Sequence, residues 1–150
     1  MSDMSDASNH LEVVHHEGYD PAINSLFVPA IKVHAGKPVY ISGVTAAPVY
    51  HDHPHIPEDF DAIPLDAASQ VALVFEHLDQ ALDAAGCRRQ DVVMLTRFLV
   101  DVAGDQDVIN KAQGEYFGDH LPTSTTVQIV RLATDPRLRL EIQAVAIAPE

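Results

Sequence analysis

One carboxylate, Glu141, lies in an otherwise apolar segment near the C-terminal end of the chain. Apolar residues alternate along 138–148, and this period of two predicts a strand with Glu141 on the face opposite the core. Val145 and Ile147 share that face with Glu141, so we expect a second subunit to bury part of it. Partial burial raises the pKa of a carboxyl group, which suits proton transfer near neutral pH.

The segment 122–132 precedes this strand, and the short turn between them predicts an antiparallel hairpin. Matching the apolar faces of the two strands sets Gln128 opposite Glu141. One sheet face then carries a stripe of hydroxyls, amides and a single carboxylate, formed by Ser124, Thr126, Gln128, Glu141 and Gln143. This composition is typical of a small-molecule site, although the solvated outer face of an ordinary hairpin has the same pattern.

Three histidines, His51, His53 and His55, alternate in a proline-rich segment, 44–65, that has no helical or strand periodicity. An extended backbone would place the three imidazoles on one side of the chain. There they can line a substrate pocket as proton donors or acceptors, or bind a transition metal. The third interpretation is a solvated loop or one that packs against another subunit.

Length and composition limit the classes of function. The chain has 150 residues, of which 47% are hydrophobic, so it fits one domain with a real core. We expect a flexible tail at 1–10 and a single domain at 11–150. Nine Lys and Arg residues against 22 Asp and Glu give a net charge of −13, which argues against nucleic acid as a partner.

The single cysteine, Cys87, excludes a disulfide within the chain. The first ten residues are polar and acidic and lack the layout of a secretory signal. The most apolar stretch, 92–102, is far shorter than the roughly 20 residues of a membrane span. We therefore expect a cytoplasmic protein without a membrane partner.

Hydrophobic periodicity predicts two helices, at 66–86 with Asp66 as the N-cap and at 105–117 closing at Gly118. The second helix is expected to bury Val108, Ile109, Ala112 and Tyr116. His77, on the first helix, is expected to be solvated. Six segments are predicted as strands, namely 11–16, 28–34, 38–42, 92–102, 122–132 and 138–148, the second and third forming a hairpin through Ala35-Gly36-Lys37.

This order of elements predicts an α+β fold, with two helices on one face of a sheet. No element remains to cover the other face. Oligomerisation through that face is the simplest solution, and a cyclic assembly would place polar clefts between protomers.

Several short motifs occur together along the chain. They are Val39-Tyr40-Ile41-Ser42-Gly43, Ala84-Ala85-Gly86, Asp91-Val92-Val93 with Phe98-Leu99, Asn110 with Tyr116-Phe117-Gly118-Asp119-His120, and Leu140-Glu141-Ile142 with Ala144-Val145-Ala146. In their order and spacing the chain resembles the Rid (YjgF-type, reactive intermediate deaminase) family over nearly its whole length. The resemblance implies a chorismate-mutase-like fold with a mostly antiparallel six-stranded sheet, and a homotrimer with three clefts at the subunit interfaces.

The resemblance also implies roles for individual residues. In the better-known deaminases of this family, the arginine of a P-x-R-S motif holds the substrate carboxylate, and a glutamate on the last strand positions the hydrolytic water. Glu141 matches that glutamate, whereas Ser124 replaces the arginine and Phe27 replaces a tyrosine; Gly43 and Asn110 are retained. Serine cannot imitate a planar, bidentate guanidinium, so the substrate of this chain is expected to differ.

The resemblance thus implies an enzyme that hydrolyses or deaminates a small reactive enamine, imine or related metabolite, without a cofactor. Glu141 and Ser124 are the candidate catalytic residues. The candidate substrate-binding residues are Phe27, Gly43, Asn110, Thr126, Gln128, His51, His53 and His55. Arg97 is expected to be a buried or interfacial ion-pair partner and is the one nearby cation that can replace the missing clamp. Two alternatives remain, a non-catalytic metabolite-binding or chaperone-like trimer and a metal-dependent hydrolase that uses the three histidines.

Overall fold

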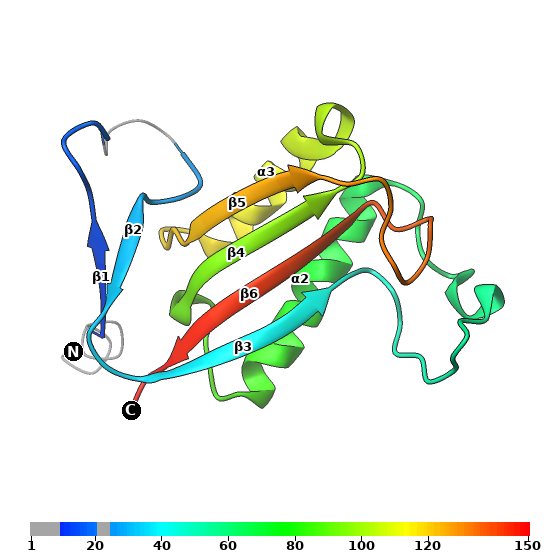
Figure 1. The fold of residues 1–150 in the computed structure, drawn as a ribbon, viewed down its shortest axis with the longest axis horizontal. Coiled ribbons are helices and arrows are strands. Elements are labelled where there is room, and N and C mark those ends of the chain that lie inside the picture. Colours follow the sequence, from blue (N-terminus) through cyan, green and yellow to red (C-terminus); the bar gives the residue numbers. More distant parts are fainter. Residues whose placement is uncertain (1–9, 21–24) are drawn as a thin grey trace.

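The structure is a computed structural model that describes residues 10–20 and 25–150 (Figure 1). The predicted tail therefore lies outside the described residues except for His10, which is buried with its Nε2 3.0 Å from the carbonyl oxygen of Ile147. The elements run in the order β1 (Leu11–Val14), β2 (Ala30–Val33), β3 (Lys37–Val44), η1 (Pro57–Phe60), α2 (Ala67–Ala84), η2 (Arg89–Asp91), β4 (Val92–Leu99), α3 (Val102–Phe117), β5 (Thr123–Gln128) and β6 (Leu140–Ala148).

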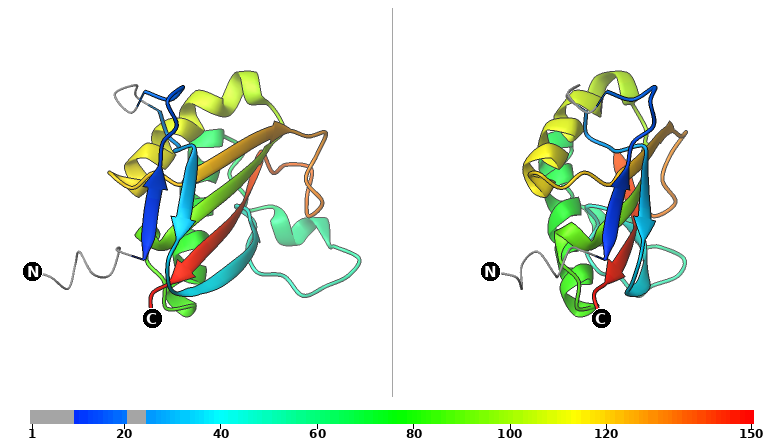
Figure 2. Two further views of the ribbon diagram at one scale, coloured as in Figure 1. Left: turned by 60° about the vertical axis from the view of Figure 1, so that its left-hand side comes forward. Right: turned by 90° about the vertical axis from the view of Figure 1, so that its left-hand side faces the viewer.

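Two sheets are present. The main sheet has the strand order β3-β6-β4-β5, and β1 and β2 pair with each other beside it (Figure 1). Strand β6 is antiparallel to both β3 and β4, whereas β5 is parallel to β4. The α+β class and the packing of both helices on one sheet face are confirmed (Figure 2). The expected mostly antiparallel six-stranded sheet is wrong, because four strands form a mixed sheet and two form a separate one.

Neither predicted hairpin forms. β2 pairs with β1, while β3 pairs with β6. The segment between β5 and β6 is not a tight turn, because Leu132 and Leu138 are buried in a second apolar cluster with Ala46, Phe60 and Ile63. That longer connection lets β6 cross to the far side of β4 and leaves β5 beside β4 at the edge of the sheet.

Both helices follow the sequence pattern, with one exception in the second. The side chain of Asp66 accepts a hydrogen bond from the amide of Ser69 at the start of α2, and the buried stripe Val71, Val74, Leu78 and Leu82 faces the sheet. In α3 the prediction that Val108 is buried is wrong, since it is 40% exposed. Gln113 is buried in that helix, because its side chain accepts a hydrogen bond from a buried arginine of β4, Arg97.

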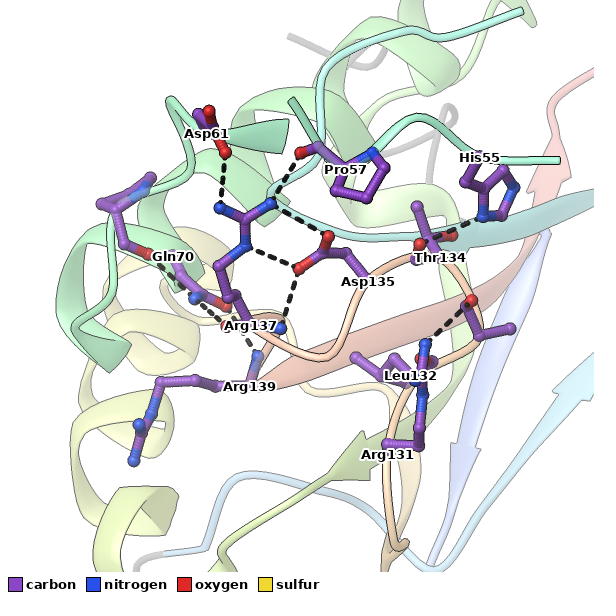
Figure 3. A network of polar contacts seen from close by, with 12 residues as sticks. His55, Pro57, Asp61, Gln70, Arg131, Leu132, Thr134, Asp135, Arg137 and Arg139 are labelled. Carbon is purple, nitrogen blue, oxygen red and sulfur yellow. Dashed lines mark hydrogen bonds and ion pairs between the residues drawn. The ribbon is translucent and has the colours of Figure 1, made fainter. Parts of the chain in front are cut away.

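The long segment after β3 is held in place by a polar network around Arg137 (Figure 3). The guanidinium donates to Asp61 and to the carbonyl oxygen of Pro57, each at 2.8 Å, and to Asp135 at 2.9 Å. The buried Gln70 of α2 donates to the carbonyl oxygens of Pro64 and Arg137. These contacts fix 57–64 against the connection between β5 and β6.

The prediction of no membrane span can be compared with the length and hydrophobicity of the helices. None of those in the described parts of the chain is both long and apolar enough to cross a membrane.

Candidate active site

Glu141 lies in β6 directly opposite Phe98 of β4, on the sheet face that points away from the helices. The period-two prediction for this strand is confirmed, because Leu140, Ile142, Ala144 and Ala146 are buried in the core. Glu141 is partly buried, and burial raises its pKa above that of an ordinary glutamate. No hydrogen bond or ion pair from any residue in 10–20 or 25–150 reaches its carboxylate.

Glu141 does not form an ion pair with Arg139, two residues earlier in the chain. Arg139 instead binds Asp105 of α3 in a bidentate pair, with its Nε and Nη2 at 2.8 and 2.9 Å from the two carboxylate oxygens. The Glu141 carboxylate thus has no partner among the described residues, which leaves it available to water or substrate.

Gly43 lies at an irregularity where β3 shifts register against β6. A Cβ atom at position 43 would lie 2.6 Å from the carboxyl carbon of Glu141 and would overlap a carboxylate oxygen. The lack of a Cβ atom at Gly43 thus lets the carboxylate lie against the main chain of β3, and a larger residue would displace the Glu141 side chain.

A cavity of about 370 Å³ opens beside this pair. Gly43, Glu141, Tyr50, His77, Gln80 and Thr134 are among the residues that line it. His77 was expected to be solvated, but its Nδ1 lies 2.7 Å from the carbonyl oxygen of Thr45. Its position next to the core residue Leu78, on the edge of the buried stripe of α2, is the signal that places it at this cavity.

The three alternating histidines lie near this cavity but are not among its lining residues. His51 and His53 are exposed, and His55 Nδ1 is 3.1 Å from the carbonyl oxygen of Thr134. The rings of His53 and His55 pack around Tyr50, with centroids 5.8 and 4.8 Å from its ring. In the described part of the chain, no three His, Cys, Asp or Glu side chains lie close enough together to hold a metal ion.

A second cavity, of about 380 Å³, lies between β4, β5 and α3. Ser124, Thr126, Asn110 and Phe27 line it, so the structure brings together four of the predicted site residues. Arg97 and Gln113 also line it. Sequence analysis missed Gln113, because a glutamine on a helix gives no sign that it is buried.

The side chains of Glu141 and Arg97 lie on opposite faces of the sheet, although the Glu141 cavity also reaches His77 and Gln80 of α2. Thr126 is paired with Arg97, which points toward α3, whereas Val127 and Glu141 flank Phe98 on the other face. The predicted stripe that joins Ser124 and Thr126 to Glu141 is therefore wrong within one chain.

Gln128, a predicted substrate-binding residue, has a structural contact within the chain. Its side chain accepts a hydrogen bond of 2.9 Å from the amide of Val102, the first residue of α3. It thus caps a helix, which is a structural use of the side chain.

Comparison with known proteins decides the family. A family model described as "Endoribonuclease L-PSP" matches residues 20–148, and matching relatives carry reactive intermediate deaminase and Rid names. The chain belongs to the Rid family. This confirms the resemblance seen in the motifs, and the fold agrees with the YjgF fold of solved Rid proteins.

Rid relatives are similar along most of the chain. The putative reactive intermediate deaminase TdcF of Escherichia coli K12 is 31% identical over 113 residues, covering 72% of this chain and 85% of that protein. Protein DfrA of Myxococcus xanthus is 31% identical over 134 residues, and the alignment covers 89% of this chain and 93% of that protein. The crystal structure of the Rid protein YyfB from Yersinia pestis has a TM-score of 0.75 at 23% identity, over 92% of this chain and 98% of that one.

Proposed function

We propose that this Rid protein hydrolyses the C=N bond of a small imine, or of its enamine tautomer, in clefts between the protomers of a homotrimer. The observation that carries the proposal is the partly buried Glu141 carboxylate, which has no partner in the described part of the chain and lies against Gly43 at the wall of a cavity. Two relatives support the reaction class by name, TdcF and a 2-iminobutanoate/2-iminopropanoate deaminase of Escherichia coli that is 28% identical over 88 residues.

In the proposed reaction, Glu141 accepts a proton from water as the water oxygen attacks the imine carbon. The resulting carbinolamine carries one hydroxyl and one amino group. When the substrate is the protonated imine, Glu141 returns the proton to the carbinolamine nitrogen, the C–N bond breaks as the hydroxyl gives its proton to Glu141, and the products are a carbonyl compound and ammonia. The carboxyl group then loses that proton to solvent. The raised pKa of Glu141 suits this exchange. A pKa closer to neutral pH lets the same carboxyl group both accept and donate a proton at that pH.

The separation of Glu141 from the cavity that contains Ser124 supports the trimer. One chain holds Glu141 on one sheet face and the hydroxyl and amide groups of Ser124, Thr126 and Asn110 on the other. A single ligand needs both sets, for proton transfer and for orientation. A cyclic assembly brings the Glu141 cavity of one protomer to the Ser124 cavity of the next.

Exposed apolar side chains on the open sheet face also support an assembly. Tyr40 and Met94 both lie beside Val145 on that face and are 79% and 43% exposed. Val127, on the same face, is 40% exposed. Side chains of this size along one sheet face are typical of a protein–protein contact.

The test is to generate short-lived imino acids with an amino-acid oxidase and to follow keto acid and ammonia. We expect the protein to accelerate the conversion and the Glu141→Gln variant not to. The matched control is Glu58→Gln, which removes the same charge from an exposed position outside both cavities. Full activity of folded Glu141→Gln would contradict the mechanism.

Ser124 gives one reason to consider a second function, a trimer that binds a metabolite without turnover. A serine at this position supplies a hydroxyl in place of the guanidinium of the related deaminases. Saturable ligand binding with no product in mass spectra would establish this alternative. Ribonuclease activity, which the name of the family model mentions, is disfavoured by the net charge of −13.

A further inference from the structure

Arg97 is a buried cation that has no anionic partner among the described residues. It is 4% exposed, and its Nε donates to Thr126 Oγ1 at 2.8 Å. Its Nη1 donates to Asn110 Oδ1 at 2.8 Å and to Gln113 Oε1 at 3.0 Å. All three acceptors are neutral oxygens.

The other arginines show how unusual this is. Arg88, Arg89, Arg137 and Arg139 each form an ion pair with an aspartate, and Arg131 is exposed to solvent. Acidic residues are abundant in this chain, with 22 Asp and Glu in 150 residues. Burying a charge without a counter-ion costs free energy. The presence of the Arg97 guanidinium in an inner strand therefore indicates a functional role.

The free end of Arg97 faces the cavity between β4, β5 and α3. Its Nη2 donates to none of the described residues, and it is not among the atoms that are sealed from solvent without a partner. Two of the five guanidinium N–H groups are therefore available at a cavity of about 380 Å³. Its lining contains no Asp or Glu from the described part of the chain, and consists mainly of hydroxyl and amide side chains.

We propose that Arg97 binds the carboxylate of a small anionic ligand in this cavity. Thr126, Asn110 and Gln113 hold the guanidinium in one orientation, so little side-chain entropy is lost when the anion binds. Ser124 lies on the same side of β5, two residues before Thr126, and its small side chain leaves the room that the anion occupies. The inference rests on the proposed function and adds Arg97 to the residues that bind its substrate.

The test measures binding separately from turnover. The probe is 2-oxobutanoate, the stable keto acid that imine hydrolysis would yield, titrated calorimetrically into the full-length protein. The neutral control probe is 2-butanone, in which a methyl group replaces the carboxylate of 2-oxobutanoate. We expect saturable binding of 2-oxobutanoate, at least about tenfold weaker binding of 2-butanone, and an affinity for 2-oxobutanoate that falls about 10- to 100-fold in Arg97→Met.

Two further variants isolate the role of the guanidinium. Arg97→Lys keeps the charge and should retain part of the affinity. Arg131→Gln removes one charge from an exposed arginine that donates only to main-chain carbonyl oxygens, and it should bind as the wild type does. Unchanged binding in folded Arg97→Met, or an equal loss in Arg131→Gln, would overturn the inference.

A measurement on the wild type covers the case in which Arg97→Met does not fold. The side-chain Nε–H resonance of Arg97, assigned through bonds, should shift when 2-oxobutanoate is added. Binding without that shift, or no saturable binding by the wild type, would contradict the proposal.

Imine turnover and carboxylate binding can fail independently. Turnover with an unchanged KM in Arg97→Met would refute the role of Arg97 and leave the deaminase proposal standing. Arg97-dependent binding of 2-oxobutanoate without any imine turnover would support the role of Arg97 and refute the deaminase proposal.

Discussion

The carboxylate of Glu141 occupies the space in which a side chain at position 43 would lie, so that Gly43 and Glu141 form one structural unit. The register shift between β3 and β6 occurs at this point. The lack of a Cβ atom at position 43 permits the close approach of the carboxylate to the β3 main chain. The position of the candidate base is therefore fixed by a residue that has no side chain.

This relationship predicts that Gly43→Ala displaces the Glu141 carboxylate and lowers kcat about 100-fold, since a shift of about 1 Å in a catalytic group has an effect of that size. The measurement is kcat for imino acid hydrolysis, with circular dichroism to verify the fold. In a Glu141→Gln background the same change should have little further effect, because the displaced group is already absent. Additive losses in the double variant would show that Gly43 acts on something other than Glu141.

Glu141→Gln should lower kcat by a factor of about 10² to 10⁴, the usual contribution of a general base. The base must be deprotonated to accept a proton from water. Because burial raises the pKa of Glu141, the acidic limb of the wild-type rate profile should lie above the ordinary glutamate value of 4.5. A pH profile of kcat for the wild type and for the exposed control Glu58→Gln checks this, and a limb at or below that value would contradict the partly buried setting of the base.

The parts of the fold that follow from local pattern were predictable from sequence. Asp66 and the apolar spacing around Leu78 define α2, and the period of two puts Glu141 on the face opposite Ile142. The partner of β5 was not predictable. The alternation of apolar and polar residues around Val127 is compatible with antiparallel pairing to β6 and with parallel pairing to β4. The strand that β5 pairs with therefore depends on the path of the segment between β5 and β6.

Arg97 and Gln113 show a second limit of sequence reasoning. Arg97 was predicted to be a buried or interfacial ion-pair partner. Its burial is confirmed, but the ion pair is wrong for the described residues, because its acceptors there are neutral oxygens. A glutamine at position 113 of a helix normally indicates a solvated side chain. Its burial depends on a guanidinium that comes from another element, and that contact is visible only in three dimensions.

The raised pKa of Glu141 also predicts a pH-dependent effect on stability. A carboxyl group whose pKa is raised by folding favours the folded state while it is protonated, and this contribution is lost as the pH rises through the folded-state pKa. At pH 7 the ionised group opposes folding, so Glu141→Gln should unfold at a higher urea concentration than the wild type. The difference should disappear well below the ordinary pKa of 4.5. A variant that is less stable at pH 7 would show that the carboxylate has a stabilising partner in the assembled protein.

The Arg137 network predicts a local loss of stability. Arg137→Met removes the donors to Asp61, Pro57 and the buried Asp135, which should lower the free energy of unfolding and the urea concentration at the unfolding midpoint. Hydrogen exchange should show the largest loss of protection in 57–64. Arg137 lowers the pKa of Asp135, so the wild-type advantage is present above the ordinary aspartate value of 3.8 and is lost as the pH falls through the lowered pKa. Arg131→Gln is the control, and an equal loss there would refute a specific role for Arg137.

Mixed trimers test whether each active site combines two protomers. Glu141→Gln inactivates one cavity, and Ser124→Phe fills the other with a larger side chain. Each variant alone should be inactive. If both cavities of one site belonged to the same chain, every chain in a co-expressed mixture would carry a defect and no activity would return. If they belong to neighbouring protomers, a Glu141 from a Ser124→Phe chain can meet an intact Ser124 cavity from a Glu141→Gln chain, and random mixing of equal amounts restores about a quarter of the wild-type sites.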